Sequence, residues 1–119
     1  MKYMLLVYLE EGALNDAERE HCYVESAQLA QDLSTSGKYI ASGPLRPVST
    51  ATSLRVRNGK RLVTDGPFAE TREQLGGYFF IDAGDLDQAL DIAARIPGAR
   101  IGTVEIRPVM EIEGLPTEM

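Results

Sequence analysis

The chain has few of the residues that build disulfides and soft-metal sites, with one cysteine and one histidine among 119 residues. A lone cysteine excludes an intramolecular disulfide and fits a reducing cytoplasm. His21 and Cys22 are the only strong soft-metal ligands, and neighbouring positions on a helix do not face one another. We therefore expect no zinc site and no cofactor.

Positive charge and long apolar runs are also scarce. Twelve Lys and Arg stand against eighteen Asp and Glu, a net charge of −6, which argues against nucleic acid as the main partner because phosphate binding needs a positive field. No stretch approaches the ~20 apolar residues of a membrane span. Lys2 precedes a short apolar run that meets Glu10 without a cleavage site, so a first strand is expected rather than a signal peptide. The sequence predicts one cytoplasmic domain over residues 1–119, with no membrane partner.

The first third of the chain is predicted to form a strand followed by a long helix. Residues 2–9 have apolar side chains in both alternating sets, which predicts a strand covered on both faces. A helix is predicted over residues 16–36, with Asn15 as its N-cap, Glu18 three residues on and Gly37 after its end. Its inward stripe at helical spacing comprises Cys22, Ser26, Leu29, Ala30 and Leu33.

Five further strands and a second helix follow. Strands are predicted over residues 38–45, 51–57, 60–65, 75–83 and 102–112. Asn58-Gly59 separates two of them and is the strongest two-residue hairpin signal. A helix capped by Asp85 runs to about residue 96, and Pro108 marks an edge or a bend in the last strand. The buried stripe of the second helix is predicted to comprise Leu86, Ala89, Leu90, Ala93 and Ile96.

The order of elements is therefore β-α-β, a β-hairpin, then β-α-β. Two split βαβ units of this kind predict an α+β, ferredoxin-like sandwich with an antiparallel sheet and two helices on one face. Two helices leave the second apolar face of the sheet without a cover from the same chain. A second copy is the simplest cover, so we predict a homodimer.

The hairpin register supplies one candidate for chemistry. If Asn58-Gly59 is a two-residue loop, Leu54 faces Val63, and Asp65 lies on the same face at its open end. A carboxylate at the rim of an apolar surface is a candidate general acid or base. The alternative is that Asp65 hydrogen-bonds the backbone of the turn it begins.

The hairpin also carries cations on its other face. Arg55, Arg57 and Lys60 would share that face in the same register. They either guard an exposed strand edge against aggregation or contact an acidic protein partner.

The remaining polar candidates point to binding. The chain has no G-x-S-x-G, no G-x-G-x-x-G and no P-loop. Glu70 and its loop neighbours could bind a polar substrate or a hard cation such as magnesium, although a solvated loop face is the simpler interpretation and no metal is predicted. Arg46 and Arg107 could each clamp a carboxylate, and the alternative is a structural ion pair with Glu105.

Several segments together resemble one family. They are residues 2–8, the run Asp65-Gly66-Pro67-Phe68, residues 75–78, the 85–98 helix and residues 104–109. In these segments the chain resembles the YCII-related, DGPF-domain proteins over nearly its whole length. The resemblance implies a ferredoxin-like fold that pairs into a dimeric α/β barrel.

The same resemblance implies two kinds of role. Some relatives look like small-molecule enzymes with a His–Asp pair in a pocket, one type acting in chloroaromatic breakdown. Others are encoded beside, or fused to, alternative sigma factors. The histidine of the enzyme-like branch aligns with Ser26, so this chain departs from that pattern and leaves Asp65 without its usual partner.

We therefore expect a homodimer that binds a small organic molecule in a cleft between sheet and helices, near the 65–71 loop. Whether it is an enzyme stays open. Acid/base chemistry on a small aromatic or carbonyl-bearing substrate would use Asp65. The alternative function is a non-enzymatic regulatory partner of an alternative sigma factor. The residues expected to contact substrate are Tyr8, Arg46, Phe68, Glu70, Tyr78 and Arg107.

Overall fold

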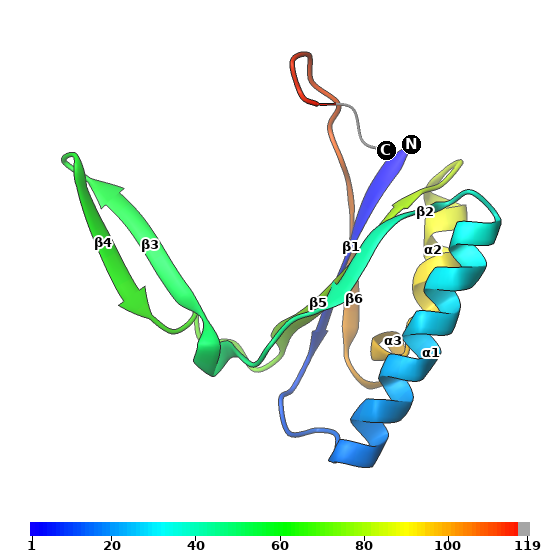
Figure 1. Cartoon of the computed structure of the whole chain (residues 1–119), viewed down its shortest axis with the longest axis horizontal. Coiled ribbons are helices and arrows are strands. Elements are labelled where there is room, and N and C mark those ends of the chain that lie inside the picture. The colour runs from blue at the N-terminus through cyan, green and yellow to red at the C-terminus, as the bar shows by residue number, and fades with distance from the viewer. Residues whose placement is uncertain (117–119) are drawn as a thin grey trace.

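The computed structural model describes residues 1–116 and has α+β architecture (Figure 1). Within these residues no helix is long and apolar enough to cross a bilayer. The elements are β1 (Lys2–Leu9), α1 (Asp16–Thr35), β2 (Tyr39–Pro44), a 3₁₀ turn (Val48–Thr50), β3 (Thr52–Arg57), β4 (Lys60–Asp65), β5 (Gln74–Asp82), α2 (Leu86–Ala94), α3 (Gly98–Ile101) and β6 (Thr103–Pro108).

Four strands form one antiparallel sheet in the order β2-β5-β1-β6. The three helices lie on one side of this sheet (Figure 1). In this order the strands of the two βαβ halves alternate, since β2 and β1 come from the first half and β5 and β6 from the second. This arrangement is compatible with a ferredoxin-like fold. β6 is an edge strand and ends at Pro108, as the break in its alternation predicted, although four residues earlier than expected.

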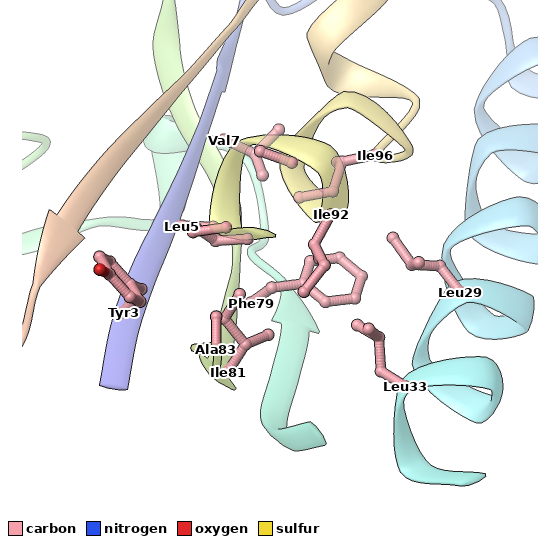
Figure 2. Packing of buried hydrophobic residues seen from close by; sticks show 12 residues of the cluster. Tyr3, Leu5, Val7, Leu29, Leu33, Phe79, Ile81, Ala83, Ile92 and Ile96 are labelled. Carbon is pink, nitrogen blue, oxygen red and sulfur yellow. The ribbon is translucent and has the colours of Figure 1, made fainter. Parts of the chain in front are cut away.

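The core lies between the sheet and the helices. Every second residue of β1 and β5 points into it, so the strand period of two separates buried from half-buried side chains. Figure 2 shows this packing, to which the sheet contributes Tyr3, Leu5, Val7, Phe79 and Ile81, α1 contributes Leu29 and Leu33, and the α2 region contributes Ile92 and Ile96.

The long helix α1 packs unevenly along its length. Its start is the predicted capping box, in which the Asn15 side chain accepts from the Glu18 N–H and the Glu18 carboxylate accepts from the Asn15 N–H. Only Leu29 and Leu33, both in its C-terminal half, are buried. The N-terminal half therefore overhangs the sheet with no buried side chain of its own.

The second helical region confirms most of its predicted stripe and corrects the rest. Ala89, Ala93 and Ile96 are buried as predicted, whereas Leu86 and Leu90 are about half exposed. Ile92, which lay outside the predicted stripe, is buried instead and shares a face with the three at helical spacing. α2 ends at Ala94, and the short helix α3 begins directly after Pro97, since proline is well tolerated at a helix start.

The hairpin is confirmed in position and register. Leu54 pairs with Val63 and Thr52 with Asp65, and Asn58 and Gly59 both have positive φ, as a two-residue hairpin turn requires. β3 and β4 pair only with each other. Together they stand away from the main sheet, on the side opposite the helices (Figure 1).

Candidate functional site

A cleft of about 790 Å³ lies between the sheet and the N-terminal half of α1. Its floor is apolar and comes from Val7 and Leu9 of β1 and Phe79 of β5. Pro97 and Ile101 close one side. The cleft exists because α1 is packed against the core only by its far half, as described above.

The overhanging half of α1 forms the roof of the cleft. Arg19, Cys22, Tyr23 and Ser26 all line it, at the three- and four-residue spacing that places side chains on one helix face. Cys22 and Ser26 are half-buried, which agrees with the inward stripe predicted from sequence. Ser26, which the sequence placed in that inward stripe, thus lines the cleft.

The mouth of the cleft is held by hydrogen bonds that join the loop after β2, the loop after β1 and the start of β5. The Leu45 N–H donates to the Gly76 carbonyl at 2.9 Å, and the Val48 N–H donates to the Glu11 carboxylate at 2.9 Å. The Glu11 N–H in turn donates to the Gln74 side chain at 3.0 Å. The segment after β2 is therefore fixed on both sides of Arg46.

Arg46 is the free cation of the cleft. It contributes to the lining and is exposed, and it makes no ion pair or hydrogen bond with any residue in 1–116. The other lining arginine, Arg19, is engaged by Asp16 at 3.1 Å and by the Leu14 carbonyl. Arg46 thus presents an unsatisfied guanidinium on a backbone that its neighbours hold in place.

The carboxylates of the lining are occupied. Glu10 accepts from Arg72 at 2.6 Å, and this contact raises the pKa of the already basic Arg72 guanidinium. Glu11 accepts from the Val48 N–H. The Glu10 charge is therefore paired with a cation, whereas Glu11 keeps its negative charge and is held by a neutral amide. Arg46 is the lining cation that has no carboxylate partner among residues 1–116.

A pair of glycines at the start of β5 also lies at this site. Gly76 and Gly77 both line the cleft. A Cβ on Gly77 would lie 3.1 Å from the Gly43 carbonyl oxygen, so the absent side chain lets β2 approach β5 closely. The pair serves close packing and leaves bare backbone in the cleft floor.

The predicted site residues divide between three places. Arg46 and Tyr78 line the cleft. Asp65, Phe68 and Glu70 are exposed at the foot of the hairpin and in the loop that follows it, and none of them contributes to the lining. The cleft therefore forms between sheet and helices as expected, but away from the 65–71 loop, because the hairpin carries that loop to the other side of the sheet.

The third place is the open face of the sheet, turned away from the helices. Tyr8 lies there on β1, and Arg107 lies there on β6, where its guanidinium is 3.6 Å from the Glu105 carboxylate. Tyr78 borders both places: it contributes to the lining of the cleft, but its ring lies over Gly43 and, by alternation with buried Phe79, is directed to the open face. Arg107 thus has the structural partner that the sequence left as an alternative.

The polar groups of the cleft that sequence reasoning missed include Arg19 and Tyr23. Extending the inward stripe from Ser26 and Cys22 by one turn toward the helix start would have reached Arg19. Gln74 and Glu11 carry no such signal, since they meet only because β1 and β5 are paired.

Comparison with known proteins places the chain in a family. The model of the YCII-related domain matches residues 1–113. The chain is also 38% identical over 118 residues to an uncharacterized protein of Rhizobium meliloti (strain 1021), with 92% of each chain covered. The matched range includes every strand and helix around the cleft, and on this ground the chain belongs to the YCII-related family.

Proposed function

We propose that this protein binds a small organic acid in the cleft beneath the N-terminal half of α1. One observation carries the proposal: a cleft of about 790 Å³ with an apolar floor has at its mouth the guanidinium of Arg46, which is unpaired among residues 1–116. Pockets that bind small molecules typically have volumes of roughly 300–1,000 Å³ and few, well-placed polar groups.

The chemistry of the lining selects the ligand class. An apolar floor favours a hydrophobic or aromatic body, and a planar guanidinium favours a carboxylate, which it can hold through two parallel hydrogen bonds. Ser26 and Tyr23 supply hydroxyl groups from the roof that can orient a second polar substituent.

The proposal is one of binding. Asp65, the acid/base candidate from sequence, does not line this cleft, and the lining carboxylates Glu10 and Glu11 are engaged by other groups. Ser26 stands where relatives with a proposed His–Asp pair have histidine. Proton transfer on a small aromatic or carbonyl-bearing substrate would therefore need a group supplied by the ligand or by a second copy.

We further propose a cytoplasmic homodimer in which two copies of this single domain join their open sheet faces as a dimeric α/β barrel. Met4, Leu6, Tyr8, Tyr78 and Phe80 are only half-buried on that face. An apolar sheet face of this kind is stabilised by a second sheet packed about 10 Å away.

The alternative function is that of a regulatory partner of an alternative sigma factor. The observation that favours it is the basic hairpin, whose cations Arg55, Arg57 and Lys60 are exposed without a carboxylate partner in residues 1–116. An acidic protein surface would suit it.

The ligand proposal is tested by thermal-shift screening of aromatic and aliphatic carboxylates, each beside its neutral amide, followed by calorimetric titration of the best binder. We expect carboxylates to bind and amides to fail. Arg46→Gln should weaken binding by about tenfold or more, as expected for loss of a charge-assisted hydrogen bond. Lys60→Gln, which removes one positive charge outside the cleft, is the matched control and should bind normally.

A second variant tests where the ligand binds rather than the role of the Arg46 charge. Ser26→Phe adds an aromatic ring to the roof and should abolish binding while the protein stays folded. Ligand should also slow alkylation of Cys22, which lines the same cleft. If Arg46→Gln and Ser26→Phe both bind the ligand as tightly as the original chain, the ligand binds elsewhere.

A further inference from the structure

The hairpin has two strand edges with no partner. β3 and β4 form a separate two-stranded sheet, and a two-stranded hairpin alone is marginally stable in water. Its apolar side chains are uncovered, with Leu54 55% and Val56 56% exposed. Exposed edges of this kind are the places where an extended segment adds as a further strand.

The two faces of β3 differ in chemistry. Leu54 and Val56 point to one face, where Leu54 pairs with Val63. Arg55 and Arg57 point to the other, where Arg57 pairs with Lys60. A strand that completes this edge must therefore be apolar on one face and acidic on the other.

The segment that follows β6 has this pattern. Met110 is 79% and Ile112 57% exposed, and they alternate with Glu111 and Glu113. In an extended conformation the two apolar side chains would point to one face and the two carboxylates to the other. Neither glutamate has an ion pair within residues 1–116.

The charges of hairpin and chain also oppose each other. Residues 52–65 carry four Lys or Arg and one Asp, a net +3, while the whole chain carries −6, so the remainder is −9. A second copy of this chain is therefore an acidic partner in itself. Attraction between the hairpin and the body of another copy is favourable, whereas two hairpins repel.

The two segments leave the sheet from opposite ends. β6 ends at Pro108, opposite Tyr3 at the start of β1, and β5 begins after the hairpin at Gln74, opposite Leu9 at the end of β1. These positions are six residues apart along β1, roughly 20 Å at the rise of a strand. The hairpin then turns outward (Figure 1), which favours a contact between chains over one within a chain.

We propose that residues 110–113 of a second copy add to the free edge of β3 as a third strand. Met110 and Ile112 then cover the Leu54–Val56 face, and Glu111 and Glu113 face Arg55 and Arg57. The inference rests on the proposed homodimer. In a two-fold dimer the contact occurs twice, since the hairpin of each copy receives the segment of the other.

Charge reversal tests the contact. In a hairpin variant Arg55 and Arg57 become Glu, and in a tail variant Glu111 and Glu113 become Lys. Each is expected to raise the dimer Kd by about tenfold or more at low salt, because four like-charge contacts replace four attractive ones. Sedimentation velocity over a dilution series measures the Kd, and far-UV circular dichroism checks that both variants are folded.

Mixing the two variants distinguishes a contact between chains from one within a chain. The mixture should restore tight heterodimers, because each reversed hairpin meets a reversed tail; a contact within one chain would not be restored. The combined hairpin and tail variant, of net charge −6, should also dimerise like the original chain. Its matched control joins the hairpin variant to Glu20→Lys and Asp91→Lys, exposed helix positions, keeps the same net charge and should stay weak.

Three results would overturn the proposal. One is an unchanged dimer Kd in the hairpin variant, which leaves the homodimer intact but assigns the hairpin to a different acidic partner. Another is loss of dimer affinity that mixing does not restore. The last is a monomeric original chain, which removes the homodimer as well. Ligand binding in the cleft is measured separately by calorimetry, so its outcome is independent of all three.

Discussion

At the scale of single residues, the absence of a side chain lets the end of α3 lie close to β1. Gly102 joins α3 to β6, and a Cβ there would clash with the Tyr8 carbonyl oxygen and press on Leu9. The obstacle is backbone in a paired strand, which cannot rotate away as a flexible side chain can. Any residue other than glycine would therefore push α3 away from β1.

We predict that Gly102→Ala lowers the free energy of unfolding by about 2 kcal/mol or more, within the range of overpacking substitutions. Gly84→Ala is the control, since its Cβ would meet only the end of Gln88 at 3.7 Å, and it should change stability by less than about 1 kcal/mol. Urea melts of both variants provide the measurement. If the two variants have the same free energy of unfolding, the α3–β6 turn accommodates the added Cβ without loss of stability.

At the scale of elements, ion pairs complement the sparse core contacts of α1. Arg100 of α3 donates two hydrogen bonds to Glu25, at 2.8 and 3.0 Å, and Arg95 donates to Asp32 at 2.6 Å. The Arg100 hydrogen bonds hold the pKa of Glu25 below its ordinary value of 4.5. The pKa of Asp32 is also lowered, chiefly by Gln28 and then by Arg95. The helix over the cleft is thus tethered by groups that acid can neutralise.

The pKa of Glu25 sets a pH dependence. A carboxyl whose pKa is lower in the folded state than its ordinary 4.5 stabilises the fold above that ordinary value, and the contribution is lost as the pH falls through the folded pKa. Glu25→Gln should therefore be less stable than the original chain at pH 7, and the difference should shrink below about pH 4.5 and vanish in stronger acid. Urea midpoints from pH 7 to pH 3 measure this. A difference that stays constant over the range would show that Glu25 and Arg100 do not pair in solution.

At the scale of the whole molecule, a single copy is more extended than a compact chain of its length. Its radius of gyration is 16.1 Å, whereas a compact chain of this length has about 13.5 Å. The hairpin that stands off the sheet accounts for the excess (Figure 1). An extended chain with a half-buried apolar sheet face is the form expected of one partner in an assembly.

We predict a sedimentation-equilibrium mass of about twice the 13.0 kDa chain at micromolar concentration. Phe80→Glu, which places a charge on the open sheet face, should give monomers, because an unpaired carboxylate in that interface would be desolvated. Val24→Glu is the matched control on the outer side of α1, where Val24 is 63% exposed, and it should remain dimeric. A dimeric Phe80→Glu would remove the open face from the interface.

Much of the fold follows from local sequence. Asn58-Gly59 predicted the hairpin and its register because only a two-residue turn with positive φ suits that pair. The Asn15–Glu18 capping box predicted the start of α1 to the residue. The two-residue period of side chains along β1 separated its buried face from its half-buried face. In each case the determining interaction lies within a few residues along the chain, so it can be read without knowledge of the partners.

The site depended on contacts between distant residues. Arg46 was one of six residues expected to contact substrate, and only the pairing of β2 with β5 and the position of α1 bring it to the same cleft as Ser26. Asp65 lies in a more specific sequence motif, yet the hairpin places it on the side of the sheet opposite the helices. Leu86 and Leu90 were predicted in the buried stripe of α2 but are about half exposed, because the packing of α2 on the sheet determines which of its side chains are covered.

The sequence by itself determined the family, the order of elements, the hairpin register and the acidic charge of the chain, since these depend on residue identity and short-range backbone preferences. The tertiary structure alone decided which face of the sheet the helices cover, that the N-terminal half of α1 overhangs it, and that Arg46 is left unpaired at the resulting cleft. Those features arise from packing between segments more than twenty residues apart. No local pattern encodes them, because each side chain's surroundings are set by which distant strand becomes its neighbour.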